Sequence, residues 1–79
     1  MSQQLTPPAV RLANEIAVHF HHVPAERAAT EIAEHIRLFW DPRMRADLDH
    51  RVETEPDGFD PLALAAARLL AEKHRVPPA

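Results

Sequence analysis

Histidine is the residue type in this sequence that comes closest to a pattern for metal chemistry. His19, His21 and His22 stand close together, and on a helix His19 and His22 would share one face, a spacing at which two imidazoles can bind a metal ion. A stable site needs three or four ligands, and neither an HExxH pattern nor a regular carboxylate partner accompanies these histidines. We therefore expect an exposed helix end with imidazoles near its C-terminal dipole and no metal ion, and a histidine-rich metal-binding protein is the alternative.

Catalytic chemistry of other kinds has few candidate residues. The sequence contains no cysteine and no tyrosine, and its one serine is Ser2, so residues for nucleophilic catalysis are almost absent. Paired acids, such as Glu31 with Glu34, lie in charge-rich stretches that usually form solvated helix faces. A single glycine excludes a glycine-rich phosphate loop. The sequence predicts no catalytic residue and no enzymatic activity for this chain alone.

Length and composition limit the remaining classes. The 79 residues predict a single helical domain over 1–79, with frayed ends at 1–5 and 76–79. The net charge of −3 argues against a general nucleic-acid surface. No stretch reaches the roughly 18 apolar residues of a membrane span, and the first residues lack the pattern of a secretory signal. The absence of cysteine suits a reducing compartment, so we expect a cytoplasmic protein without disulfides.

Four segments carry the spacing of amphipathic helices, and each opens on proline. We expect helices over about 7–22, 24–39, 42–53 and 61–73, which together make an all-α protein, a small bundle of three to four short helices with proline-initiated corners. Thr6 is the expected N-cap of the first helix, with Pro7 at its first position and a hydrophobic staple between Leu5 and Val10. The cationic end at 73–75 suits the C-terminus of the fourth helix.

Apolar stripes on these segments define the expected core. They comprise Ala9, Leu12, Ala13, Ile16, Ala17 and Phe20 in the first segment, Ala25, Ala28, Ala29, Ile32, Ala33, Ile36 and Phe39 in the second, Met44, Leu48 and Val52 in the third, and Leu62, Ala65, Ala66, Leu69 and Leu70 in the fourth. The short connection at Val23 and Pro24 predicts that the first two helices form an antiparallel hairpin, in which the alanines allow a close approach.

The core is thin for a chain that must fold alone. Alanine makes up a large share of the apolar residues, and alanine contributes little when it is buried. Ordering a chain costs about 1.5 kcal/mol per residue, which leaves an isolated domain of this size near zero net stability. We therefore expect the chain to self-associate or to complete its stabilisation on a partner.

The same sequence pattern occurs twice at the connections between helices: an aromatic residue, an Asp N-cap and a proline. It occurs as Trp40, Asp41 and Pro42, and again before the fourth helix, where Asp60 is the expected cap. At the first corner Trp40 stands next to Arg43, Met44 and Arg45, and these residue types supply much of the binding energy at protein interfaces. A purely structural corner, with Trp40 in the core and both arginines solvated, is the alternative.

The sequence resembles the delta subunit of the soluble, molybdenum-containing NAD-dependent formate dehydrogenases. The resemblance rests on RLANEIA at residues 11–17 and on IAEHIRLFWDPRMR at residues 32–45, and it spans about residues 11–70. The chain departs from the family where a glycine-rich turn is common and this sequence has EPDGFD at residues 55–60. A free-standing helical nucleic-acid-binding module is the alternative, although acids at Asp47, Asp49, Glu53 and Glu55 disfavour it.

The resemblance implies a chain without its own redox cofactor that acts in assembly or stability. It implies that other subunits of the complex carry molybdenum pterin, iron–sulfur clusters, FMN and the NAD site, in agreement with the absence of cysteine for cluster ligation. The partner it implies is the large (alpha) subunit. Its motif residues, taken as partner-binding, are Asn14, His35, Trp40, Asp41, Pro42, Arg43 and Arg45. Arg43 and Arg45 could also bind the cofactor's phosphate. From its position beside the apolar stripe, His35 is expected at the core edge, and a place on a partner surface is the alternative.

Overall fold

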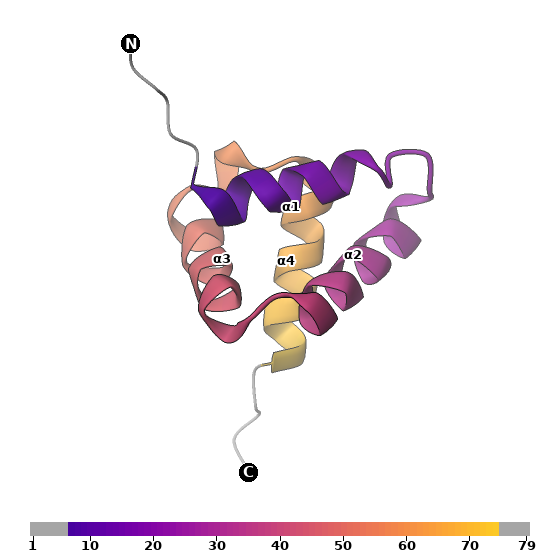
Figure 1. Cartoon of the computed structure of the whole chain (residues 1–79). Coiled ribbons are helices and arrows are strands. Elements are labelled where there is room, and N and C mark those ends of the chain that lie inside the picture. The colour runs from indigo at the N-terminus through magenta and orange to yellow at the C-terminus, as the bar shows by residue number, and fades with distance from the viewer. Residues whose placement is uncertain (1–6, 75–79) are drawn as a thin grey trace.

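The fold is described by a computed structural model of residues 7–74, with side chains described from residue 7 to residue 72 (Figure 1). Within this range the chain forms α1 (Pro8–Val18), α2 (Ala25–Phe39), α3 (Pro42–Thr54), the short 3-10 helix η1 (Pro56–Gly58) and α4 (Pro61–His74), and it contains no strand. The predicted all-α fold is therefore confirmed. The expected cap at Thr6, the staple from Leu5, the frayed ends and the cation Arg75 lie outside the described residues.

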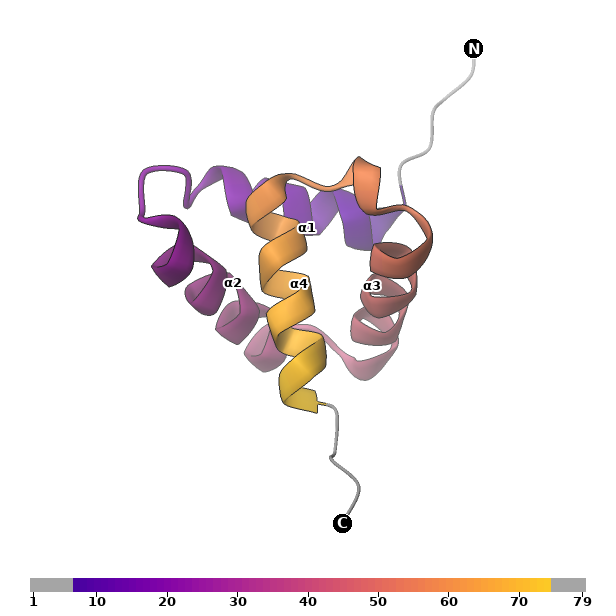
Figure 2. The same cartoon turned by 180° about the vertical axis from the view of Figure 1, so that it is seen from behind.

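Helix α4 is the centre of the arrangement. It lies between α2 and α3 in both views, and α1 crosses its N-terminal half (Figures 1 and 2). The closest packing is between α2 and α4, whereas α1 and α2 touch only marginally. The predicted α1–α2 hairpin is therefore wrong. Short connections favour neighbouring helices, but here the small side chains of α2 and α4, such as Ala29 and Ala66, let those two helices pair instead.

The core is small but continuous, and each of the four α-helices contributes to it. Its largest fully buried side chains are Val10 from α1, Ile32 and Ile36 from α2, Leu48 from α3 and Leu70 from α4. The predicted stripe of α2 is confirmed from Ala28 to Ile36, whereas its two end residues, Ala25 and Phe39, are exposed. On α1, Val10 is buried, and Leu12 and Ile16 are half-buried, as is Phe20 in the turn that follows. Met44 and Val52 flank Leu48 as half-buried neighbours.

The buried face of α4 differs from the predicted one. Ala63, Ala66, Ala67 and Leu70 are buried, and Ala65 is exposed. This set follows helical spacing but is rotated by about one residue from the predicted stripe. Apolar side chains surround most of α4, so its sequence pattern alone does not determine which face is buried. The position of α4 between α2 and α3 determines it.

The helix starts follow the proline and aspartate signals. Asp41 caps α3 by accepting a hydrogen bond from the Met44 N–H at 2.9 Å, and Asp60 caps α4 by accepting one from the Leu62 N–H at 2.8 Å. Both predicted caps are confirmed. Helix α1 begins one residue later than predicted, with Pro7 as N-cap and Pro8 in the first turn.

Helix α1 also ends earlier than predicted, at Val18 instead of His21 or His22. The N–H groups of His19, Phe20 and His21 donate to carbonyls three residues back, which tightens the last turn and stops the helix. Pro24 favours an extended conformation in the residue before it, so the helix could not have continued through this segment. His19 and His22 therefore do not share a helical face, and the spacing that suggested a chelating pair is absent.

None of the helices within residues 7–74 combines the length and the apolar character needed to cross a bilayer.

Candidate functional site

The histidine cluster forms a contact within the chain. His21 Nε2 lies 2.8 Å from Asp60 Oδ2, which ties the turn after α1 to the start of α4. His19 and His22 are exposed. In the described part of the chain, no group of three or more His, Cys, Asp or Glu residues is arranged to hold a metal ion.

Asn14 joins α1 to the loop that precedes α4. Its Nδ2 donates to the Gly58 carbonyl at 2.9 Å, and its Oδ1 accepts from the Asp60 N–H at 2.8 Å. Both ends of the amide are thus used across 44 and 46 residues of sequence. The loop is the segment in which this chain departs from a glycine-rich turn, and Gly58 has no positive φ that would require glycine. The structure gives Asn14 a role in holding the fold together.

Replacing Asn14 with alanine is expected to lower the free energy of unfolding by about 1–3 kcal/mol, because the Asp60 N–H is part-buried and loses its partner. Chemical denaturation followed by circular dichroism measures the change. Thr30→Ala is the matched control, since it removes an exposed local hydrogen bond within α2 and should change stability very little. Equal losses in both variants would contradict the role of Asn14 as a clip.

The chain turns sharply between α2 and α3 at Trp40. Its backbone is extended, with φ −92° and ψ 143°, and its N–H donates to the Ile36 carbonyl at 2.9 Å. The half-buried indole packs against the core, while Asp41 and Pro42 start the next helix. Trp40 therefore packs against the core, as the hypothesis of a structural corner requires. It is also partly exposed, as the hypothesis of a binding surface requires.

An apolar surface lies directly before this turn. Phe39 is 72% exposed and Leu38 is 61% exposed, and among the described residues Val18 is the one other large hydrophobic residue with such exposure. His35, one turn earlier, is exposed, and its ring centroid lies 4.9 Å from that of Phe39. The expectation that His35 sits at the core edge is therefore wrong, because His35 lies outside the arc of α2 that bears the buried Ile32 and Ile36. Adjacent exposed apolar side chains are typical of a surface that binds another protein.

The arginines near the turn differ in how they are engaged. Arg37 donates two hydrogen bonds to Glu34, at 2.9 and 3.1 Å, and this hydrogen bonding, with the charge of Glu34, raises the pKa of Arg37. Arg45 is half-buried. Arg43 is exposed and has no ion-pair partner among the described residues. Arg43 is thus the cation at this turn that is best placed to meet a partner.

We call this set the corner surface: His35, Leu38, Phe39, Trp40 and Arg43. The structure brings it together at the α2–α3 turn, whereas α1, which bears Asn14, crosses the opposite half of α4 (Figure 1). Sequence reasoning missed the exposure of Leu38 and Phe39. The adjacent pair Phe39 and Trp40 could have indicated it. Only one of two neighbouring aromatic side chains can pack into the core at a single turn, so the other is left exposed.

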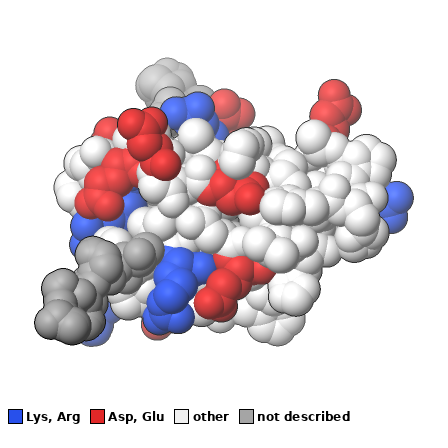
Figure 3. Space-filling model, turned by 90° about the horizontal axis from the view of Figure 1, so that it is seen from above, with Lys and Arg blue, Asp and Glu red and all other residues white. Residues whose placement is uncertain are grey.

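Charge is mixed over the face that contains α1. Basic and acidic side chains alternate there with neutral surface, and the described residues form no broad basic patch on that face (Figure 3). Phosphate binding depends on concentrated positive charge, so this face does not favour the nucleic-acid-binding alternative.

Fold and surface together define a small all-helical protein with an exposed aromatic corner. The family model of the NADH-dependent formate dehydrogenase delta subunit, FdsD, matches residues 9–67. The chain therefore belongs to the FdsD family. The matched residues include Asn14 with its partners Gly58 and Asp60, and the whole corner surface. Searches of curated proteins and of solved structures found no match.

Proposed function

We propose that this chain is a non-catalytic delta subunit that binds the large, molybdenum-containing subunit of a formate dehydrogenase in the cytoplasm. There it stabilises the large subunit or assists its assembly and the insertion of its cofactor. The family match supports the complex, and the absence of cysteine supports the assignment of the iron–sulfur clusters to the other subunits. Those subunits would also carry the molybdenum pterin, FMN and NAD.

The observation that carries the proposal is the exposure of Leu38 and Phe39 beside Trp40. Burial of one such side chain contributes about 1.5–3 kcal/mol, and in the isolated chain this contribution is not realised. Aromatic residues and arginine dominate the energetic centres of protein interfaces. The corner surface offers both, and docking on a partner would complete the thin core next to Trp40.

Arg43 supplies the directional part of the proposed contact. A guanidinium forms bidentate hydrogen bonds with a carboxylate or a phosphate, so either a partner carboxylate or the phosphate of the pterin cofactor suits it. Arg45 is half-buried at the same turn. We therefore assign the partner contact to Arg43 first and to Arg45 second.

Co-expression of the tagged chain with the other formate dehydrogenase subunits tests the proposal. We expect the large subunit to co-elute with the tag in size-exclusion chromatography, and its molybdenum content to fall when the chain is omitted. Elution of the tagged chain by itself from a preparation that contains the intact, molybdenum-loaded enzyme would contradict the proposal.

A further inference from the structure

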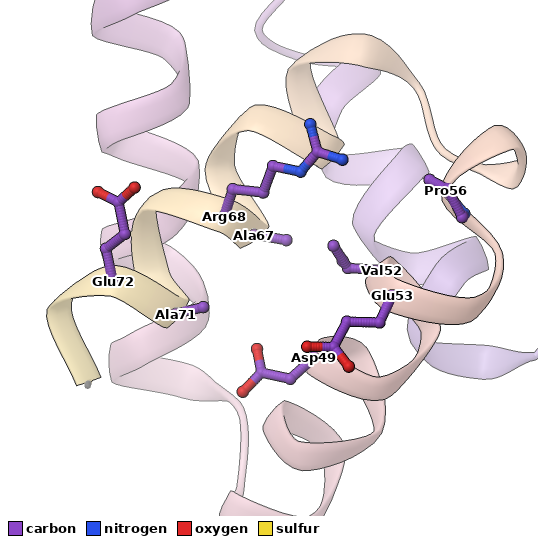
Figure 4. A pocket seen from close by; sticks show the side chains of 8 residues that line it. All are labelled: Asp49, Val52, Glu53, Pro56, Ala67, Arg68, Ala71 and Glu72. Carbon is purple, nitrogen blue, oxygen red and sulfur yellow. The ribbon is translucent and has the colours of Figure 1, made fainter.

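A groove between α3 and α4 is separate from the corner surface and shares no residue with it. It encloses about 660 Å³. Its lining combines apolar and charged side chains from both helices and from η1 (Figure 4). The lining residues are Asp49, Val52, Glu53, Pro56, Ala67, Arg68, Ala71 and Glu72.

Small side chains explain why the groove exists. Where α4 faces α3 it presents Ala67 and Ala71, whose short side chains fill little of the space between the two helices. Val52 and Ala71 are half-buried, so they keep apolar surface open to solvent. Pro56 closes one end of this apolar floor. A hollow of this size can accept one or two aliphatic side chains of a partner.

Negative charge dominates the walls. Asp49 and Glu53 project from α3 toward the gap in Figure 4, Glu72 stands on the outer edge of α4, and Arg68 is the one cation among the lining residues. The nearby Arg51 does not line the groove. It is held by Glu55 at 2.8 Å and by Asp47 at 3.3 Å, and the hydrogen bond with Glu55 raises its pKa. Asp49 already interacts within the chain, so Glu53 and Glu72 are the carboxylates that remain for a partner. An apolar floor flanked by these two carboxylates is complementary to apolar side chains flanked by lysine or arginine.

We infer that the α3–α4 groove binds a basic amphipathic helix of a partner protein. Apolar side chains of that helix would cover Val52 and Ala71. Its lysine or arginine side chains would lay their aliphatic stems along the floor and place their charges near Glu53 and Glu72. The chain would then hold a partner at two separate surfaces, the corner and the groove. This second surface does not depend on the identity of the partner at the corner.

A labelled full-length chain, titrated with a synthetic amphipathic peptide of leucine and lysine, tests the inference by NMR. We expect shifts of the amide signals of Val52, Glu53, Ala67 and Ala71, and no shifts with a peptide in which glutamate replaces lysine. The double variant Glu53→Lys with Glu72→Lys should weaken binding by about tenfold or more. Both positions lie near helix C-termini, where a cation is favourable, so this variant is expected to fold.

The control variant, Glu15→Lys with Glu31→Lys, makes the same change in net charge at sites outside the groove. It should retain most of the affinity. Equal weakening by both double variants would overturn the inference, because binding would then follow net charge alone. Ala71→Phe fills the groove without a change in charge and is expected to abolish the shifts, so undiminished binding by this variant would also overturn it.

The chain's own C-terminal segment, residues 75–79, is the competing occupant, since it begins with the basic Arg75 and follows the groove in sequence. Removal of residues 75–79 should leave the amide signals of Val52 and Ala67 unchanged in the absence of peptide. A shift of these signals on truncation would assign the groove to the chain itself and overturn the inference of a partner helix.

Discussion

Replacing Leu48 with alanine is expected to lower the free energy of unfolding by about 2–5 kcal/mol, which is enough to unfold much of a small domain. Leu48 has 0% exposure and is the one fully buried side chain of α3. The rest of α3 is exposed or half-buried, so this residue carries most of the attachment of α3 to the core. Its loss leaves a cavity between α3, α1 and α4, and α3 has no second buried side chain to compensate.

Chemical denaturation followed by circular dichroism measures the effect, and Met44→Ala is the control. Met44 lies one turn before Leu48 on the same face but is half-buried, so its truncation creates no closed cavity and should cost clearly less. Similar losses in the two variants would show that Leu48 does not anchor α3.

The second large effect is expected in binding. The double variant Phe39→Ser with Arg43→Glu should lower the affinity for the formate dehydrogenase large subunit by about a hundredfold, since it removes an aromatic anchor and reverses a charge at the centre of the corner surface. Both side chains are exposed, so the thermal stability of the isolated chain should be nearly unchanged. Co-purification of tagged variants with the other subunits measures the loss.

Val18→Ser with Arg27→Glu is the matched control. Val18 is 58% exposed and Arg27 is exposed, so the control changes the same kinds of chemistry elsewhere. It should co-purify like the unmodified chain, and an equal loss would contradict the corner assignment. Arg45→Glu is less suitable as a test, because half-buried Arg45 couples binding to folding.

Local signals predicted the parts of the fold that depend on neighbouring residues. The caps at Asp41 and Asp60 follow from the geometry of an aspartate that precedes a proline. The buried face of α2 follows from apolar residues at helical spacing against a charged opposite face. These features involve contacts within one or two turns, so the sequence contains the information directly.

Features that depend on which helices meet were not predictable in the same way. The pairing of α2 with α4, in place of an α1–α2 hairpin, results from alanine faces far apart in sequence. The face of α4 was ambiguous because alanine and leucine surround most of that helix. Phe39 follows the apolar stripe of α2 but is the last residue of the helix, past its last buried residue, Ile36.

The candidate site also contains residues whose position the sequence predicts and a residue whose role depends on contacts far apart in sequence. Six of the seven motif residues that the resemblance implies lie between residues 35 and 45, at the end of α2, in the turn after it and at the start of α3. Asn14 is the exception, since its amide holds Gly58 and Asp60 within the chain. A match to the family pattern does not separate a residue that binds a partner from one that supports the fold. For Asn14, its hydrogen bonds within the chain make that distinction.

Hydroxyl-radical footprinting of the chain, alone and in the purified formate dehydrogenase complex, tests the central claim most directly. It reports the solvent exposure of side chains, the property on which the corner surface is defined. We predict that Leu38 and Phe39 are oxidised readily in the isolated chain and strongly protected in the complex, while Val18 keeps its reactivity in both. Unchanged oxidation of Phe39 in a complex that contains the chain would contradict the account.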